Sequence, residues 1–186
     1  MSSYPSISAD KLSRLIGTAK MPVIIDVRTD EDFAADQRLI PGAVRRNHQE
    51  AGDWGTQFAG RSAIVACLRG QKLAEGTAAW LRHADVSAET LDGGFEGWKV
   101  AELPLVPALK LPARDAQGRT VWVTRARPKI DRIACPWLIR RFIDPAAVFL
   151  FVAPSEVLAV GERFNATPFD VENVFWSHRG ELCTST

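Results

Sequence analysis

The stretch Ser62-Ala63-Ile64-Val65-Ala66-Cys67-Leu68-Arg69-Gly70-Gln71-Lys72-Leu73-Ala74 decides the fold of the first half of this chain. A short apolar run ends at Cys67, a compact loop with one glycine follows, and a helix-forming segment then begins. This order places Cys67 at the carboxyl end of a buried strand, opposite the N-terminus of a helix. Unpaired backbone N–H groups and the positive end of the helix dipole favour an anionic sulfur there. The alternative is a small buried residue that ends a core strand.

The segments around this stretch alternate between helix and strand patterns. We predict strands over residues 23–27, 62–66 and 88–91, and helices capped by Ser8 and Thr29 and over residues 71–81 and 95–101. This alternation predicts an α/β fold, with a parallel sheet flanked by helices. The active crevice of such sheets lies beyond the carboxyl ends of the strands, where Asp26 and Cys67 fall.

Length and composition narrow the class of protein. The chain has 186 residues, enough for one ample domain or for a domain and a fragment. Its net charge of +1 gives no overall attraction to nucleic acid or membrane. Three widely spaced cysteines argue against a disulfide framework. No signal peptide pattern is evident and no apolar run approaches the roughly 20 residues of a membrane span, so we expect a cytoplasmic protein.

Four motifs occur in an order that identifies a family. They are Ile25-Asp26-Val27-Arg28, Ile40-Pro41-Gly42-Ala43, Cys67-Leu68-Arg69-Gly70-Gln71-Lys72 and Leu91-Asp92-Gly93-Gly94-Phe95-Glu96-Gly97-Trp98. Through them, residues 5–106 resemble a rhodanese homology domain, the sulfurtransferase module. Arg38-Leu39 stands where the family often has Gly-His, and we expect only a local surface change there.

The resemblance implies that Cys67 is the catalytic nucleophile. In the family this cysteine takes a sulfane sulfur from a donor such as thiosulfate, becomes a persulfide, and passes the sulfur to a thiol or cyanide acceptor. Main-chain amides of Leu68, Arg69, Gly70, Gln71 and Lys72 are expected to hold the charged sulfur. No cofactor is implied.

The role of each of three cationic side chains near Cys67 can be interpreted in two ways. Lys72 and Arg69 either attract the anionic donor or are solvated charges. Arg28 either lends positive potential to the sulfur pocket or forms a structural ion pair with Asp26. Gly70 lets the loop turn without a Cβ clash.

Loop length distinguishes sulfur transfer from phosphate chemistry. Cysteine phosphatases and arsenate-reducing relatives use Cys-x5-Arg around a tetrahedral anion. Here only six residues run from Cys67 to Lys72, and position 73 is Leu. The tighter ring favours one extra sulfur atom over a phosphoryl group.

A second module begins after a proline-rich connector, which we place at residues 107–118. Beyond it we predict strands over residues 120–124, 148–152 and 174–177, and helices over residues 130–143, perturbed by Pro136, and 155–160. The pattern indicates a smaller, incomplete α/β module over residues 119–186.

Basic residues gather at the start of this module. Between residues 119 and 141 there are seven Lys or Arg and one acid, Asp131. The run is either a solvated face or a site for an oxyanion effector. No helix-turn-helix pattern is present in the sequence, so nucleic acid is not an expected partner.

The second module resembles the C-terminal domain of the chromate-resistance B proteins, regulators linked to chromate export. The resemblance rests on Trp122-Val123-Thr124-Arg125, residues 128–143 and Ser177-His178-Arg179-Gly180-Glu181-Leu182-Cys183. The family continues further, so the module reads as truncated. We predict structural roles and no metal for a mixed set of ligand-type residues, with a metal or oxyanion cluster as the alternative: Asp131, Cys135, His178, Glu181 and Cys183.

Three functions therefore compete. The favoured one is a sulfurtransferase that works through a Cys67 persulfide. The second is a non-catalytic sensor of chromate, another oxyanion or redox state. The third, a cysteine phosphatase or arsenate reductase, is disfavoured by the short loop.

Overall fold

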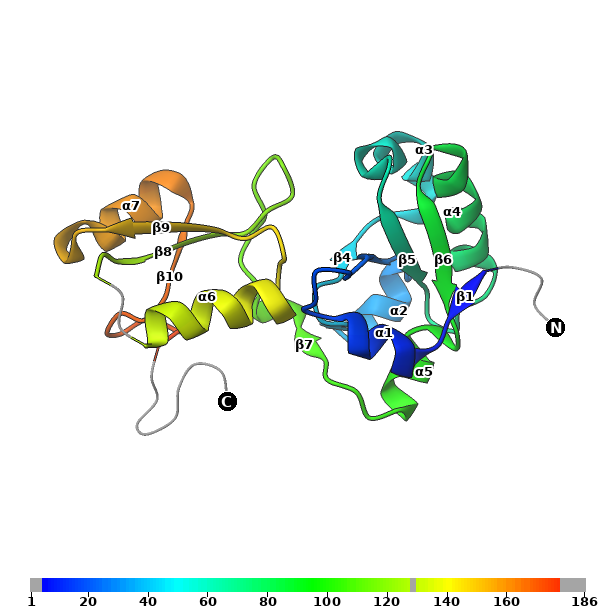
Figure 1. Ribbon diagram of the computed structural model, residues 1–186, viewed down its shortest axis with the longest axis horizontal. Helices are drawn as coiled ribbons and strands as arrows, with labels where there is room; N and C mark the ends of the chain where they lie inside the picture. The colour runs from blue at the N-terminus through cyan, green and yellow to red at the C-terminus, as the bar shows by residue number, and fades with distance from the viewer. Residues whose placement is uncertain (1–4, 128–129, 178–186) are drawn as a thin grey trace. The chain divides into compact units, whose positions relative to one another are not determined.

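The computed structural model describes residues 5–127 and 130–177, without the side chain of Asp131, and divides into two compact units (Figure 1). Unit 1 is Met1–Leu109 and unit 2 is Lys110–Thr186. The division falls within the predicted connector. The helices of the described residues include none long and apolar enough to cross a membrane.

Unit 1 is built on a parallel sheet, as predicted. Its order is β1-β6-β5-β2-β4, and every neighbouring pair is parallel. The strands are β1 (Ser6–Ile7), β2 (Val23–Asp26), β4 (Val44–Arg45), β5 (Ser62–Ala66) and β6 (Ser87–Leu91). The central strands β5 and β2 are apolar along most of their length, because a sheet covered on both faces buries successive side chains.

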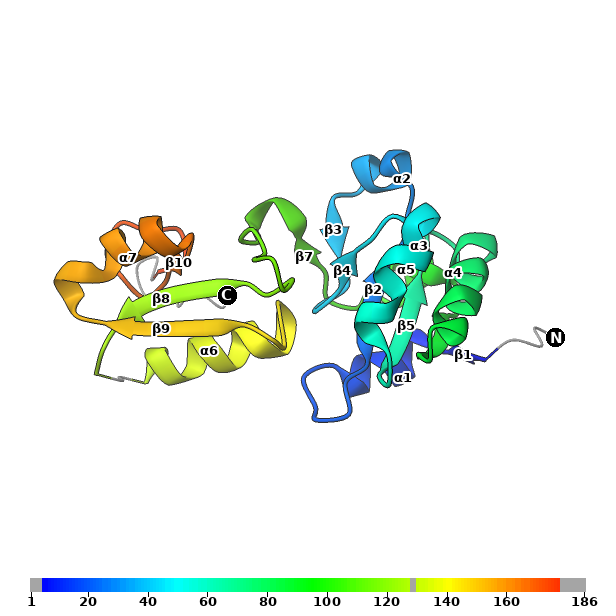
Figure 2. The ribbon, with the colours of Figure 1, turned by 90° about the horizontal axis from the view of Figure 1, so that it is seen from above.

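Helices flank this sheet (Figure 2). They are α1 (Ala9–Leu15), α2 (Asp30–Ala35), α3 (Ala51–Trp54), α4 (Lys72–His83) and α5 (Gly94–Val100), with short 3₁₀ turns at His48–Glu50, Gly55–Phe58 and Ala108–Lys110. The predicted caps are confirmed: Ser8 Oγ accepts from the Lys11 amide and Thr29 Oγ1 from the Asp32 amide. A cluster that includes Ile25, Val65 and Leu81 packs α3 and α4 onto one face.

The connector does more than link the units. Its first residue, Pro107, belongs to β7 (Val106–Pro107), which pairs antiparallel with β3 (Arg38–Leu39). Pro107 has no N–H to donate to a sheet. It is tolerated here because the strand pair is short and lies at an edge. Asp115 and Gly118 then close the predicted turn.

Unit 2 is a second, smaller parallel sheet. Its order is β10-β8-β9, formed by β8 (Val121–Arg125), β9 (Val148–Val152) and β10 (Thr167–Pro168). α6 (Asp131–Phe142) connects β8 to β9 and runs through Pro136. A 3₁₀ turn (Pro154–Glu156) and α7 (Val157–Phe164) lead to β10, so this helix runs further than predicted.

The predicted last strand over residues 174–177 is wrong. In that stretch only one bridge is present, Phe169 with Trp176. Asp170 and Asn173 have φ of 50° and 62°, and the chain loops round between the two bridge residues, which pair in parallel. The third strand is instead the short β10.

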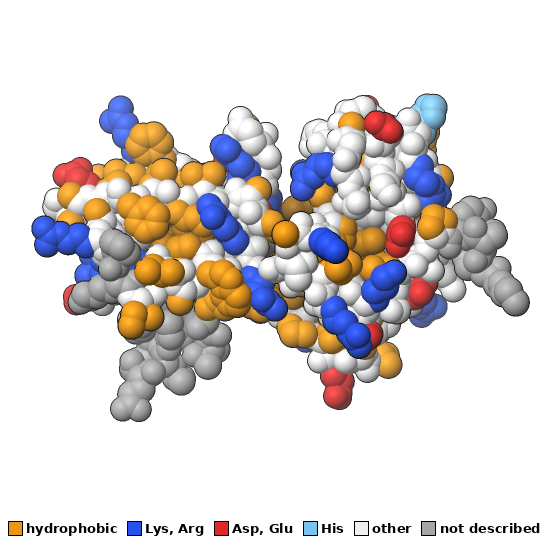
Figure 3. All heavy atoms as spheres, viewed as in Figure 1, with side chains coloured by type: hydrophobic (Ala, Val, Ile, Leu, Met, Phe, Trp, Pro, Cys, Tyr) orange, Lys and Arg blue, Asp and Glu red, His pale blue; other side chains and the backbone are white. Residues whose placement is uncertain are grey.

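Two small cores lie on opposite faces of the second sheet. Trp122 packs with Cys135 and Ile139 of α6, while Val123 packs with Val157 of α7. Several large apolar side chains of this unit remain exposed (Figure 3): Ile130, Ile133, Trp137, Phe151, Leu158, Phe164 and Phe175.

Candidate functional site

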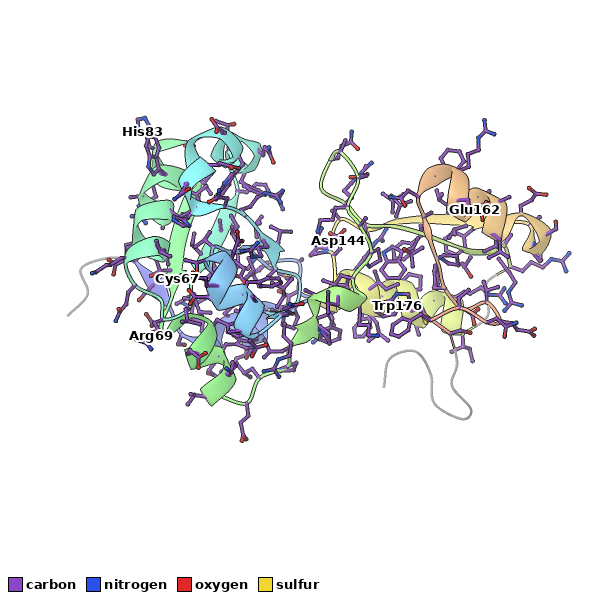
Figure 4. The ribbon with its side chains drawn as sticks, turned by 180° about the vertical axis from the view of Figure 1, so that it is seen from behind. Cys67, Arg69, His83, Asp144, Glu162 and Trp176 are labelled. Carbon is purple, nitrogen blue, oxygen red and sulfur yellow. The ribbon has the colours of Figure 1, made fainter. Side chains whose placement is uncertain are left out.

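Cys67 follows directly after β5, at the carboxyl edge of the first sheet. It lies between that strand and α4, while Arg69 extends outward from the loop (Figure 4). The Cys67 residue is 5% exposed, so the thiol is largely enclosed. Its Sγ lies 3.8 Å from the carbonyl oxygen of Gln71, to which the S–H donates. The thiol is therefore directed at the loop that precedes α4.

The loop after Cys67 is held by two glycines that touch through their backbones. Gly70 has φ of +70° and Gly94 has φ of +58°, both in the left-handed region. A Cβ at Gly94 would collide with the carbonyl oxygen of Cys67 and the amide nitrogen of Gly70. A Cβ at Gly70 would collide with the carbonyl oxygen of Leu91. The predicted role of Gly70 in the turn is confirmed.

Helix α5 orients the peptide groups of this loop. The amide of Phe95 donates to the carbonyl of Cys67 at 2.9 Å, and the amide of Glu96 donates to the carbonyl of Leu68 at 2.9 Å. The C=O and the following N–H of a trans peptide point in opposite directions. The N–H groups of Leu68 and Arg69 therefore point away from α5.

The loop leaves a run of amides without partners. Within the described part of the chain, the N–H groups of residues 68 to 74 donate no hydrogen bond to a protein group. The first four amides of a helix lack partners inside the helix, and the preceding loop extends that row here. Such a row is a ready site for an anion.

The side chains of the loop are mostly at the surface. Arg69, Gln71 and Lys72 are exposed, and Leu68 is half-buried. Lys72 is the first residue of α4. These positions keep both cations free to meet an anionic donor from solvent, and they are equally compatible with solvated charges.

Arg28 is engaged in a buried structural network. Its guanidinium donates to the carboxylate of Asp26, with Nη2 to Oδ2 at 2.6 Å, and to the carbonyls of Asp36 and Arg38. Its Cζ also lies 3.7 Å from the centre of the Phe95 ring. The side chain has no exposed surface. These contacts fit the interpretation of Arg28 as the partner of Asp26 in a structural ion pair, and none of them reaches the thiol.

The mixed set of ligand-type residues in unit 2 falls mostly outside the described residues. His178, Glu181 and Cys183 lie there, as does the side chain of Asp131. Cys135 is buried beside Trp122 in the core of unit 2. Among residues 5–127 and 130–177, no group of three or more His, Cys, Asp or Glu side chains could hold a metal ion.

The basic run of unit 2 is divided by the fold. Arg119 pairs with Asp115, while Arg140 and Arg141 lie over the rings of Phe149 and Trp137. Among the basic residues of this run that the structure describes, Arg125 and Arg132 are brought together, at the carboxyl edge of the second sheet.

The supporting role of Gly94, Phe95 and Glu96 was missed in the sequence. In the sequence, Gly93 and Gly94 served only as part of the motif over residues 91–98, at the turn before the predicted helix 95–101. One feature of the sequence could have revealed this role. The turn follows the carboxyl end of β6 and therefore lies at the same edge of the sheet as Cys67.

Two families match this chain in separate parts. The rhodanese-like domain family matches residues 8–101, and the C-terminal domain of ChrB matches residues 122–186. Both matches confirm the two resemblances found in the sequence.

One curated protein resembles part of the chain. The chain is 42% identical over 74 residues to Protein ChrB of Cupriavidus metallidurans, covering 38% of this chain and 21% of that protein. It thus spans about a fifth of that relative.

Solved structures match about half of the chain. A rhodanese-like domain protein from Staphylococcus aureus is 26% identical, with a TM-score of 0.45, over 50% of this chain and 90% of that one. A full-length protein from Lactobacillus plantarum is 22% identical, with a TM-score of 0.50, over 55% and 87%, and supports the fold alone.

Proposed function

Since this chain belongs to the rhodanese-like domain family through residues 8–101, we propose that it is a sulfurtransferase with Cys67 as its nucleophile. The observation that carries the proposal is the row of unpaired amides at residues 68 to 74, immediately beyond the thiol. A persulfide is an anion, and a charge in an enclosed site is costly unless several donors hold it.

The proposed reaction has two steps. The Cys67 thiolate attacks the outer sulfur of thiosulfate, the S–S bond of the donor breaks, and sulfite leaves with the bonding electron pair. A thiophilic acceptor, cyanide or a thiolate, then attacks the terminal sulfur of the Cys67 persulfide. The thiolate of Cys67 is regenerated, so no external oxidant or reductant is consumed.

Each part of the loop has a role in this proposal. Loop amides hold the negative charge on the terminal sulfur, which lies one S–S bond beyond Sγ. Lys72 attracts the anionic donor from solvent as a point charge, and Arg69 adds a second positive charge. The S–H to Gln71 carbonyl bond is made only by the thiol, so ionisation releases Sγ from that carbonyl.

Mass spectrometry of the intact protein tests the proposal. After thiosulfate treatment, wild type should gain one sulfur, about 32 Da, on Cys67, and dithiothreitol should remove it. The variant Cys67→Ser should gain nothing and should lose thiosulfate:cyanide turnover. Because serine is nearly isosteric, its unfolding midpoint should stay close to that of wild type. A wild-type protein with neither persulfide nor turnover contradicts the proposal.

A non-catalytic sensor is the second candidate. Two observations favour it. Residues 122–186 resemble the ChrB C-terminal domain, and Cys67 is only 5% exposed. In that case the thiol would respond to an oxidant or oxyanion without passing sulfur on. A persulfide that forms but is not transferred to cyanide would support the sensor.

A further inference from the structure

Cations and aromatic rings alternate in a row that joins α2 to α5 in unit 1. Arg45 Cζ lies 4.6 Å from the centre of the Phe33 ring, and Arg28 Cζ lies 5.1 Å from the same centre. Arg28 Cζ also lies 3.7 Å from the centre of the Phe95 ring, and Lys99 Nζ lies 5.7 Å from it. A cation is attracted to the face of an aromatic ring within about 6 Å. We call these five residues the cation–ring row.

Arg28 is the fixed member of this row. The edge of its guanidinium donates to the Asp26 carboxylate and to the carbonyls of Asp36 and Arg38. A guanidinium is planar, so bonds at its edge leave its faces available to rings. Because the edge is held by three different residues, contact with Arg28 limits where the Phe95 ring can lie.

Phe95 joins the cation–ring row to the Cys67 loop. It is 1% exposed, and its amide donates to the Cys67 carbonyl at 2.9 Å. The next amide of α5, that of Glu96, donates to the Leu68 carbonyl. These two bonds direct the N–H groups of Leu68 and Arg69 away from α5. A shift of the Phe95 backbone would therefore redirect the loop amides.

The first turn of α5 has few side chains that can hold it. The helix begins at Gly94, and its N-cap is Gly93, so neither residue has a side chain to pack. The last turn is anchored separately, because Trp98 Nε1 donates to the Pro104 carbonyl at 2.9 Å. Phe95 is thus the first side chain of α5 that can anchor the turn above Cys67.

We propose that Phe33 and Arg28 are positioning residues for the Cys67 loop and that they act on it through Phe95. The proposal rests on the proposed function in taking Cys67 as the reacting group. Without the full row, the first turn of α5 gains freedom to move. The loop amides then hold an anionic sulfur less well, because such bonds depend on direction.

Alkylation of Cys67 by iodoacetamide in Phe33→Leu tests the proposal, with the full chain and with the modified residue identified by peptide mass. Leucine keeps an apolar side chain and removes the ring between the two arginines. We expect the rate at neutral pH to fall about threefold, the usual size of coupling through packed side chains, and the pH profile to change. Phe33→Tyr keeps the ring of this half-buried residue and should restore the wild-type rate. A wild-type rate in Phe33→Leu would overturn the proposal.

Phe58→Leu is the matched control. Phe58 lies just before the amino end of β5, at the sheet edge opposite Cys67, and its ring centre is 5.9 Å from Arg61 Cζ. It is more buried than Phe33, so the loss of its ring should destabilise unit 1 at least as much. The alkylation rate should nevertheless stay as in wild type. An equal fall in both variants would mean that general loosening slows the thiol, and the positioning role would be wrong.

Arg45→Gln covers the case in which Phe33→Leu fails to fold. The Arg45 side chain is 32% exposed and lies at the outer end of the row. Its removal should lower the alkylation rate about twofold, while Arg61→Gln, which removes the cation beside Phe58, should not. In that case an unchanged rate in Arg45→Gln would overturn the proposal. A wild-type protein that forms no persulfide would contradict sulfur transfer alone, because alkylation requires only the thiol.

Discussion

At the scale of single residues, the candidate site depends on backbone more than on side chains. Gly94 lies against the carbonyl of Cys67 and the amide of Gly70, so the β6–α5 turn and the Cys67 loop interlock. The side chains that the sequence offers as cations, Arg69 and Lys72, are at the surface. We infer that the reactivity of Cys67 depends on where this turn holds the peptide planes.

Gly94→Ala tests this inference. Alanine at positive φ is strained by about 1–2 kcal/mol, and here its Cβ would also push the Cys67 loop aside. Gly60→Ala is the matched control, since Gly60 has φ of +72° with nothing within 4 Å of an added Cβ. The pH profile of iodoacetamide alkylation at Cys67 should change in Gly94→Ala and stay as in wild type in Gly60→Ala. The same profile in all three proteins would refute the positioning role.

At the scale of elements, a buried ion-pair network ties the end of β2 to the segment between α2 and β3. Arg28 bonds Asp26 and the carbonyls of Asp36 and Arg38. The carboxylate of Asp36 in turn meets Arg38 Nη2 at 2.6 Å and Lys99 Nζ at 3.5 Å. Hydrogen bonding from Arg38 lowers the pKa of Asp36 from 3.8 to about 2. The network therefore links the end of β2, the segment from α2 to β3, and α5 through charge.

Asp36 gives this network a pH dependence. Because its folded pKa lies below its unfolded value, it stabilises the fold fully above about pH 4, and that contribution is lost as the pH falls toward 2. In urea titrations between pH 4 and 2, Asp36→Asn should show a flatter loss of unfolding free energy than wild type. Arg38→Gln removes the main cause of the shift and should flatten the curve similarly. An unchanged slope in both variants would contradict this assignment.

At the scale of the whole molecule, each unit has its own sheet and its own core. In unit 2, the buried carboxylate of Asp144 accepts hydrogen bonds from the Thr120 amide at 2.6 Å and from the Thr120 hydroxyl at 2.9 Å. Thr120 Oγ1 accepts in turn from the indole of Trp122. Separate cores predict separate unfolding transitions.

Asp144→Asn should therefore destabilise unit 2 alone. The new amide places a donor against the Thr120 donors, with a cost of about 1–3 kcal/mol. Hydrogen exchange followed by mass spectrometry should show faster exchange in peptides that contain β8 and unchanged exchange in those that contain β5. Equal acceleration in both would mean that the two units unfold together.

The sequence alone determined the elements and the class of the first unit. Apolar strand runs, the Ser8 and Thr29 caps and four ordered motifs are local signals, so they identify the parallel sheet and place Cys67 at its carboxyl edge. The short strands β1, β3, β4, β7 and β10 could not be predicted, because two-residue pairs carry no periodicity and depend on the partner strand.

Only the tertiary structure decided which charges and peptides meet. Arg28 donates to carbonyls eight and ten residues away in the chain. Of the basic residues between 119 and 141 that the structure describes, Arg125 and Arg132 meet around Asp170. The interlock of Gly70 with Gly94 likewise joins two loops from different strands. Hydrogen bonds and steric contacts of this kind act over a few ångströms in space, and a linear pattern does not contain that distance.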